Sequence, residues 1–204
     1  MAGLTLVTPP AIEPFTLAAA KSHLRITSAD TTDDDYIEDE LIQAARERCE
    51  TVTNRQLITA TWDYKLDGFP ASGVIVMPKP PLLTVTSVSY VDSNGASQTF
   101  SSTLYTVRVY AGPKAQRGTV ALNYGQVWPV TRDQLDAVTI RFTCGYGATA
   151  ASVPRRLVMA MKLDMGTLYA NREDIVVGTI VTEMPGSASA HAEYLKFKSW
   201  PTEC

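Results

Sequence analysis

The sequence predicts an α+β protein in which a small helical bundle is interrupted by an inserted antiparallel β sandwich or open barrel. Apolar residues recur with helical spacing in the first quarter of the chain. From residue 56 to about residue 150, apolar and polar residues instead alternate, as they do in half-buried strands. A long and strongly apolar helix is then predicted at residues 153–169. The bundle therefore combines two N-terminal helices with one long C-terminal helix.

The composition is that of a folded protein without an excess of basic residues. The chain has 204 residues, of which 45% are hydrophobic, and 18 basic against 21 acidic side chains give a formal net charge of −3. Proteins that bind the phosphate backbone carry a basic excess, so we expect no tight, sequence-specific binding of nucleic acid by the single subunit. No apolar run approaches the roughly 18 residues of a membrane span and no secretory signal is visible, so neither membrane association nor export is expected.

The residues that usually form metal or catalytic sites are scattered along the sequence. Cys49, Cys144 and Cys204 form no CxxC pair and have no nearby histidine, which predicts neither a zinc site nor a disulfide framework and fits a reducing compartment. His23 and His191 are the only histidines, and no nucleophile motif accompanies either of them. We therefore expect no enzymatic activity, no metal and no cofactor.

The first predicted elements are an extended arm and a short helix. We expect residues 1–15 to form the arm, because Pro9 and Pro10 lack an amide donor and resist helix formation. Thr16 can cap the N-terminus of the helix predicted at residues 17–24, which consists of good helix formers. A loop then leads to the second helix.

The second helix is predicted to begin in the acidic run of Asp33, Asp34 and Asp35 and to end at Asn54. Carboxylates favour this position, since they face the positive end of the helix dipole. The first interpretation is thus a solvated helix start. Two alternatives remain open for the wider acidic cluster of Asp30, Asp33, Asp34, Asp35, Glu38, Asp39 and Glu40. Its acids, Asp33, Asp34 and Asp35 above all, could line a DNA channel, where a negative wall keeps a polyanion from adhering, or the cluster could hold a cation.

The middle of the chain is predicted to form antiparallel strands, beginning with the alternating residues 58–66. Further strands are predicted at residues 74–77, 84–91, 98–100, 105–109, 119–124 and 138–142. The dipeptide Asn94-Gly95 predicts a tight hairpin, because both residues tolerate a positive φ. The Gly-Tyr-Gly run at residues 145–147 lacks the Lys-Ser/Thr of a phosphate-binding loop, so we expect a sharp turn there.

The helix predicted at residues 153–169 has more apolar surface than one buried face requires. Leu157, Met161, Met165 and Leu168 lie on one face, and we expect them to form subunit-packing contacts. A helix of this kind has to be covered on more than one side. The two N-terminal helices are short, which leaves the sheet or another subunit to cover the rest.

The last segment, residues 175–204, is predicted to contain a strand or loop, a linker and a partner-docking end. Tyr194, Leu195, Phe197 and Trp200 lie within a few residues of one another and have no evident cover in their own chain. Large aromatic side chains near a terminus need a partner surface. We therefore expect these four residues to contact a partner.

Short motifs follow one another in a fixed order along most of the chain. They occupy residues 17–26, 44–47, 53–58, 61–62, 66–70, 81–88, 90–92, 128–129, 145–147 and 153–173. Taken together, these motifs resemble the tailed-phage head–tail connector (adaptor) proteins of the gp6-like and phiE125 gp8-like type. The resemblance covers residues 17 to about 174.

The resemblance implies a structural virion protein of the neck, assembled in the host bacterial cytoplasm. About a dozen copies would form a ring below the portal protein, and genomic DNA would pass through the ring without sequence-specific binding. Residues 1–55 and 151–174 would form the helical, ring-making part. The inserted β domain, residues 56–150, would face outward or toward stopper and tail-completion proteins. Residues 175–204 would dock on the portal.

Two alternatives to a head–tail connector remain open at this point. Another head-completion or tail-completion protein of the phage neck would belong to the same structural class. A small hydrolase or a carbohydrate-binding β module with helical flanks belongs to a different class, and it would need histidine, carboxylate and aromatic groups clustered in one pocket. The sequence shows no such set.

Overall fold

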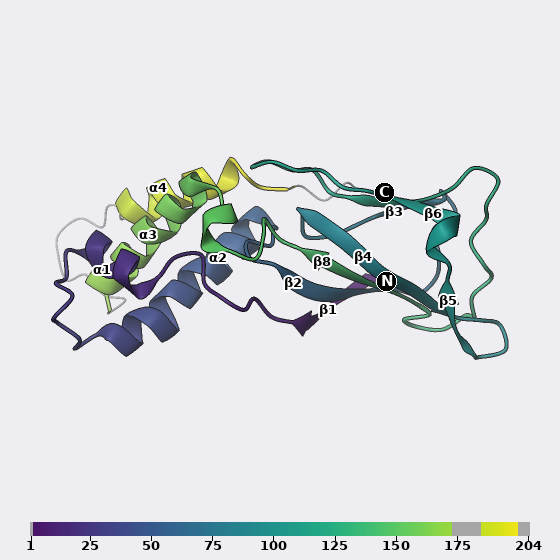
Figure 1. Ribbon diagram of the computed structural model, residues 1–204, viewed down its shortest axis with the longest axis horizontal. Coiled ribbons are helices and arrows are strands. Elements are labelled where there is room, and N and C mark those ends of the chain that lie inside the picture. The colour runs from purple at the N-terminus through teal and green to yellow at the C-terminus, as the bar shows by residue number, and fades with distance from the viewer. Residues whose placement is uncertain (1, 173–184, 200–204) are drawn as a thin grey trace, which may run out of the picture. The chain divides into compact units, whose positions relative to one another are not determined.

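A computed structural model describes residues 2–172 and 185–199 (Figure 1). The chain divides into two compact units. The sheet unit comprises Met1–Ala11 and Thr59–Gly147, and the helical unit comprises Ile12–Ile58 and Ala148–Cys204. The protein therefore has an α+β fold, as predicted, with antiparallel sheets inserted between helical parts of the sequence.

The sheet unit contains a five-stranded and a three-stranded sheet, and the paired strands run antiparallel. Across the larger sheet the strands are β1 (Ala2–Thr8), β2 (Ala60–Leu66), β8 (Val138–Cys144), β4 (Leu82–Val91) and β5 (Ser97–Phe100). Across the smaller sheet they are β3 (Val74–Val76), β7 (Thr119–Leu122) and β6 (Tyr105–Arg108). A short 3-10 helix, η2 (Ser102–Leu104), precedes β6.

One apolar core joins the two sheets. Val138, Ile140 and Phe142 of β8 are fully buried, because alternate residues of a strand point to the same face of the sheet. Val120 of β7 and Met77, which follows β3, are buried in the same cluster. The two sheets therefore pack face to face, as in the predicted sandwich.

The hairpin between β4 and β5 confirms the turn predicted at Asn94-Gly95. Gly95 has a φ of 87°, which glycine adopts without steric cost. The carboxylate of Asp92 accepts hydrogen bonds from the amides of Asn94 at 2.9 Å and Ala96 at 3.0 Å. These bonds fix the turn and, with it, the register of the two strands.

The extended arm predicted at residues 1–15 is wrong for its first half. Residues 2–8 form β1, in which Leu6 lies opposite Trp62 of β2. The prolines that predicted an arm begin only at Pro9, after the strand has ended, and the leucine, valine and threonine residues before them suit a strand. The first residues therefore belong to the sheet unit and not to the helical part.

The helical unit contains helices from both ends of its sequence. They are α1 (Leu17–Leu24), η1 (Tyr36–Ile42, π-helical), α2 (Gln43–Thr53), η3 (Ala150–Ser152, 3-10), α3 (Arg155–Ala170) and α4 (Pro185–Leu195). Thr16 caps α1 as predicted, since its hydroxyl accepts a hydrogen bond from the Ala19 amide at 3.3 Å. Asn54 ends α2 in the left-handed conformation, with a φ of 52°.

Other helices of the unit cover α3 on several sides. Leu157, Met161 and Met165 are fully buried, and Leu168 is half-buried. α3 contacts α1, η1, α2 and α4. α4 begins in residues 185–189, which were predicted to form a linker. It covers part of α3 that was predicted to be covered by the sheet or by another subunit.

α3 and α4 run antiparallel and approach each other closely. Arg156, near the start of α3, donates a hydrogen bond to Glu193, near the end of α4, at 2.7 Å. A Cβ atom at Gly186 would lie 2.5 Å from the hydroxyl oxygen of Thr167. A glycine at the start of α4 therefore allows the two helix backbones to come together.

Candidate functional site

The described residues contain neither a metal cluster nor a membrane-spanning helix. No three histidine, cysteine, aspartate or glutamate side chains within residues 2–172 and 185–199 come together as a metal ion would require. In the same part of the chain, no helix is both long enough and apolar enough to cross a membrane.

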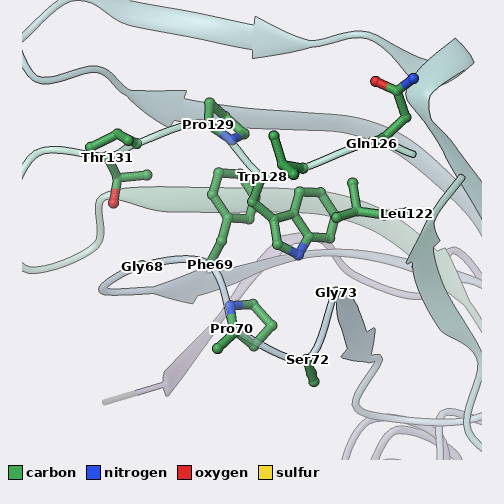
Figure 2. A pocket seen from close by; sticks show the side chains of 13 residues that line it. Gly68, Phe69, Pro70, Ser72, Gly73, Leu122, Gln126, Trp128, Pro129 and Thr131 are labelled. Atoms are coloured by element: carbon green, nitrogen blue, oxygen red, sulfur yellow. The ribbon is translucent and has the colours of Figure 1, made fainter. Parts of the chain in front are cut away.

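An aromatic pocket of about 550 Å³ lies in the sheet unit (Figure 2). The rings of Phe69 and Trp128 stack with their centroids 4.5 Å apart and their planes within 2° of parallel. Phe100 packs against the same indole at 5.2 Å. Pro70 and Leu122 complete this part of the wall. Because Trp128 is inserted among these side chains, it anchors the loop that follows β7.

The loop between β7 and β8 presents large apolar side chains to solvent. Tyr124, Val127, Val130 and Leu135 are 105%, 79%, 78% and 79% exposed. We call these four residues the loop surface. A β-bridge at Thr131 helps to fix the backbone of the loop. Large exposed apolar groups on an ordered loop are typical of a protein interaction site, and this one was not singled out from the sequence.

Asp33, the first of the three predicted channel-facing acids, is bound to the end of α3. Its carboxylate accepts hydrogen bonds from the Tyr169 hydroxyl at 2.6 Å and from the Arg172 guanidinium at 2.8 Å. The Tyr169 hydrogen bond, together with that from Arg172, lowers the pKa of Asp33 below its ordinary value. Asp33 thus links two segments of one subunit, and its role in a channel stays a prediction.

Asp34 and Asp35 are adjacent in the sequence but differ in exposure and in their hydrogen-bond partners. Asp34 accepts a hydrogen bond from the ammonium group of Lys21 at 2.7 Å, and the same ammonium donates to the Asp30 carbonyl at 2.5 Å. Lys21 is only 6% exposed, so its charge depends on these partners. Asp35 is the one of the three acids that is exposed, whereas Asp33 and Asp34 are half-buried.

Replacing Asp34 with asparagine should lower the free energy of unfolding by about 1.5 kcal/mol, because it removes a charged partner from a buried ammonium group. The matched variant Asp35→Asn should change it by less than about 0.5 kcal/mol, since that side chain is exposed. Urea denaturation of both variants beside the parent measures the difference. Equal stabilities of the two variants would contradict the assignment of Asp34 as the partner of Lys21.

The C-terminal aromatic residues lie in the helical core, which corrects the expectation that their own chain leaves them uncovered. Tyr194 is fully buried and Phe197 is 3% exposed. Leu195, between them, is 46% exposed. Trp200 lies outside the described residues. Of the four predicted docking residues, Leu195 is therefore the one that the described structure presents to a partner.

Hydrogen bonds fix the residues after α4 to the end of α2. The Arg55 guanidinium donates to the Phe197 carbonyl at 2.5 Å, and the Ser199 amide donates to the Thr53 carbonyl at 2.8 Å. The side chain of Asn54 also donates to the Ser199 carbonyl at 3.3 Å. The segment around Phe197 is therefore part of the folded subunit.

A buried carboxylate that was not singled out from the sequence connects three helices. Asp164 of α3, whose side chain is 1% exposed, accepts a hydrogen bond from Arg48 of α2 at 2.7 Å. Arg48 also donates to the Ser187 hydroxyl of α4 at 3.1 Å. Burial raises the pKa of Asp164, while the charges of Arg48 and His191 act in the opposite direction. The available signal was an aspartate between apolar positions of a predicted helix.

Arg48→Met should lower the free energy of unfolding by about 3 kcal/mol at neutral pH, because the buried Asp164 carboxylate loses its charged partner. The raised pKa of Asp164 means that its protonated form is favoured in the folded state. The ionised Asp164 carboxylate therefore lowers the free energy of unfolding more and more as the pH rises from the ordinary pKa of an aspartate through the raised pKa of Asp164. The difference in the free energy of unfolding between Arg48→Met and the parent chain should therefore be smaller at mildly acidic pH than at neutral pH.

Chemical denaturation at several pH values measures this effect. The double variant Arg48→Met with Asp164→Leu is the control, because it removes the pair without leaving a charge behind, and it should recover much of the lost stability. A loss that is the same at every pH would show that ionised Asp164 is not its cause.

The fold of this chain is similar to that of chains in solved particle structures. It is similar to a chain in a structure of the neck of an empty GTA particle computed with C6 symmetry, with a TM-score of 0.77 and 22% identity over 98% of this chain and 97% of that chain. A chain in the virion of a native gene transfer agent (GTA) particle gives the same values. A chain in the neck of a native GTA particle computed with C12 symmetry gives a TM-score of 0.70 and 21% identity over 100% and 97%.

At this level of identity, the likeness establishes a shared fold. No protein-family model matches the sequence, and no curated protein matches it.

Proposed function

We propose that this chain is a structural neck protein of a tailed phage or a phage-derived particle, where it acts as a head–tail connector. The observation that carries the proposal is the likeness to three chains from GTA particle structures over nearly the full length of both proteins. Fold alone does not fix function, but the order of the sequence motifs points to the same class of protein. Another head-completion or tail-completion protein of the neck is the second candidate, since the likeness concerns the neck in general.

The proposed assembly is a closed ring. The similar neck structures were computed with C6 and C12 symmetry, which supports a ring of about twelve copies. Such a ring requires a heterologous contact that repeats from each subunit to the next. The ring would leave a channel through which DNA passes without sequence-specific binding, in keeping with the net charge of −3.

Two surfaces are proposed to contact the neighbouring neck proteins. The C-terminal segment, through the exposed Leu195, would dock on the portal. The loop surface would meet the stopper or tail-completion protein, because its exposed apolar side chains suit burial against another protein. In this proposal the protein acts by assembly alone and carries out no reaction.

Capture of the protein by immobilised portal tests the first of these contacts. Leu195→Asp should fold normally, because the side chain is exposed, and should bind the portal more weakly, because a charge would enter an apolar contact. Leu135→Asp, on the loop surface, should bind the portal like the parent chain. Unchanged portal binding by Leu195→Asp would remove Leu195 from the contact.

Deletion of the gene in the producing strain tests the proposed function. Electron micrographs should show DNA-filled or leaking heads separate from tails, and expression of the chain from a plasmid should restore joined particles. Joined, infectious or transducing particles in the absence of the chain would contradict the proposal.

A further inference from the structure

β1 leaves one edge of the five-stranded sheet open within the described part of the chain. It is the first strand in the sheet order, and its strand pairing is with β2 alone. All seven of its residues are exposed, and none is charged or a proline. Its one irregularity lies near its end, between Leu6 and Thr8. Sheet edges in natural proteins usually carry charges, prolines or a cover that prevents pairing with another chain, so an edge of this kind suits an added strand.

The same strand extends an apolar face beyond the core of the sheet unit. Leu4 lies opposite Tyr64 and Leu6 lies opposite Trp62, which in turn lies opposite the buried Phe142. Leu4 and Leu6 are nevertheless 39% and 44% exposed. A strand laid along β1 would therefore gain backbone hydrogen bonds and apolar contacts together.

We propose that residues 175–181 of a second copy of this chain occupy the open edge of β1. Their sequence is Ile-Val-Val-Gly-Thr-Ile-Val, which equals β1 in length. Five of these seven residues are both β-branched and apolar, a composition that favours a strand over a helix. An uncharged segment can lie against the uncharged β1 without leaving a charge buried.

Charges beside the segment and beside the edge are complementary. Glu173, Asp174 and Glu183 flank residues 175–181. On the receiving side, the ammonium group of Lys79 lies 4.8 Å from the centroid of the Trp62 ring, whereas Lys65 of β2 forms an ion pair with Asp136 at 3.4 Å. The acidic flanks disfavour pairing of the segment with another copy of itself, and Lys79 favours pairing with the β1 edge.

The two helices that precede and follow residues 175–181 lie side by side in the helical unit. The segment follows α3 and precedes α4, and these helices run antiparallel with Gly186 against Thr167. The end of α3 and the start of α4, which lie on either side of residues 173–184 in the sequence, are therefore close together in the helical unit. The inference rests on the proposed ring, in which every subunit has one open edge and one such segment, so that each interface can pair them in a repeating, closing contact.

Photo-crosslinking in assembling particles tests the inference. p-Benzoylphenylalanine in place of Thr5, at the middle of β1, should give a covalent dimer whose linked peptide contains residues from 175–181. Particles assembled from isotope-labelled and unlabelled subunits should show that the two peptides come from different copies. The same photoreactive group in place of Tyr124, on the loop surface, should give no dimer through residues 175–181.

A second variant, in which residues 175–181 are replaced by a glycine-serine sequence of equal length, should lose the dimer formed from position 5. Suppose that the chain is present in the neck. The inference would then be overturned if position 5 formed crosslinks only within one chain, formed them only to other proteins, or formed none. Absence of the chain from the neck would instead refute the proposed function, and with it the assembly on which the inference rests.

Discussion

A chain that lacks residues 187–204 is expected to lose most of the stability of its helical unit. The truncation removes the fully buried Tyr194 and the nearly buried Phe197, and it uncovers part of α3. The loss of one buried aromatic side chain costs about 3–5 kcal/mol, and a typical domain is stable by only about 5–15 kcal/mol. Thermal unfolding followed by circular dichroism should show reduced helix content and an early, broadened transition.

The matched control is removal of residues 201–204 only, which takes away none of the described contacts and should leave the unfolding transition in place. A chain shortened at residue 187 that unfolds like the parent would contradict the assignment of Tyr194 and Phe197 to the core. Since the truncation is expected to affect folding, loss of portal binding in this chain would not identify a docking surface. Leu195→Asp separates the two effects, because its side chain is exposed.

Met161→Asp and Met165→Asp are each expected to destabilise the helical unit by more than about 4 kcal/mol. Both side chains are fully buried in α3, and an aspartate there would have to be buried without a partner or protonated at a cost. Met159→Asp is the control on the same helix, because Met159 is 55% exposed, and it should change the stability by less than about 1 kcal/mol.

Chemical denaturation of the three variants measures the difference, and particle assembly provides a second readout. If Met161→Asp and Met165→Asp were as stable as Met159→Asp, α3 would have to be exposed on the face that the structure buries.

Local signals with a direct physical cause predicted several parts of the fold. Asn94-Gly95 predicted the β4–β5 hairpin because the turn needs residues that accept a positive φ, and Gly95 has one. Thr16 predicted the start of α1 because a hydroxyl can bond to a free amide of the first turn. Alternation of apolar and polar residues predicted β2 and β8, because one face of β8 is buried and the apolar side chains of β2 pack, half-buried, against the same core.

The sequence did not predict elements and residues whose contacts are made with residues far away in the chain. β1 has only the short alternation Leu4-Thr5-Leu6, and the prolines that follow it favoured the prediction of an arm. α4 begins with small residues, which also suit a linker, and their use became visible only where Gly186 meets Thr167. Asp164 finds its partner 116 residues earlier, in Arg48, and no local pattern indicates such a pair.

The candidate interaction surfaces were predicted least well, because exposure depends on which parts of the chain cover one another. The aromatic residues at the C-terminus suggested an exposed anchor, yet Tyr194 and Phe197 fill the core and Leu195 alone of the described three is exposed. The loop surface was missed because Tyr124 ends a predicted strand and no local pattern shows that Val127, Val130 and Leu135 stay uncovered.

Electron cryo-microscopy of the neck in purified particles tests the proposed ring directly. We expect this chain, identified by side-chain density or by a bound antibody fragment, to form a closed ring between the portal and the tail with an open channel along its axis. The position of Leu195 and of the loop surface in that map would assign their partners. The proposed function would be wrong if the chain were found in the head shell, along the tail tube, or nowhere in the particle.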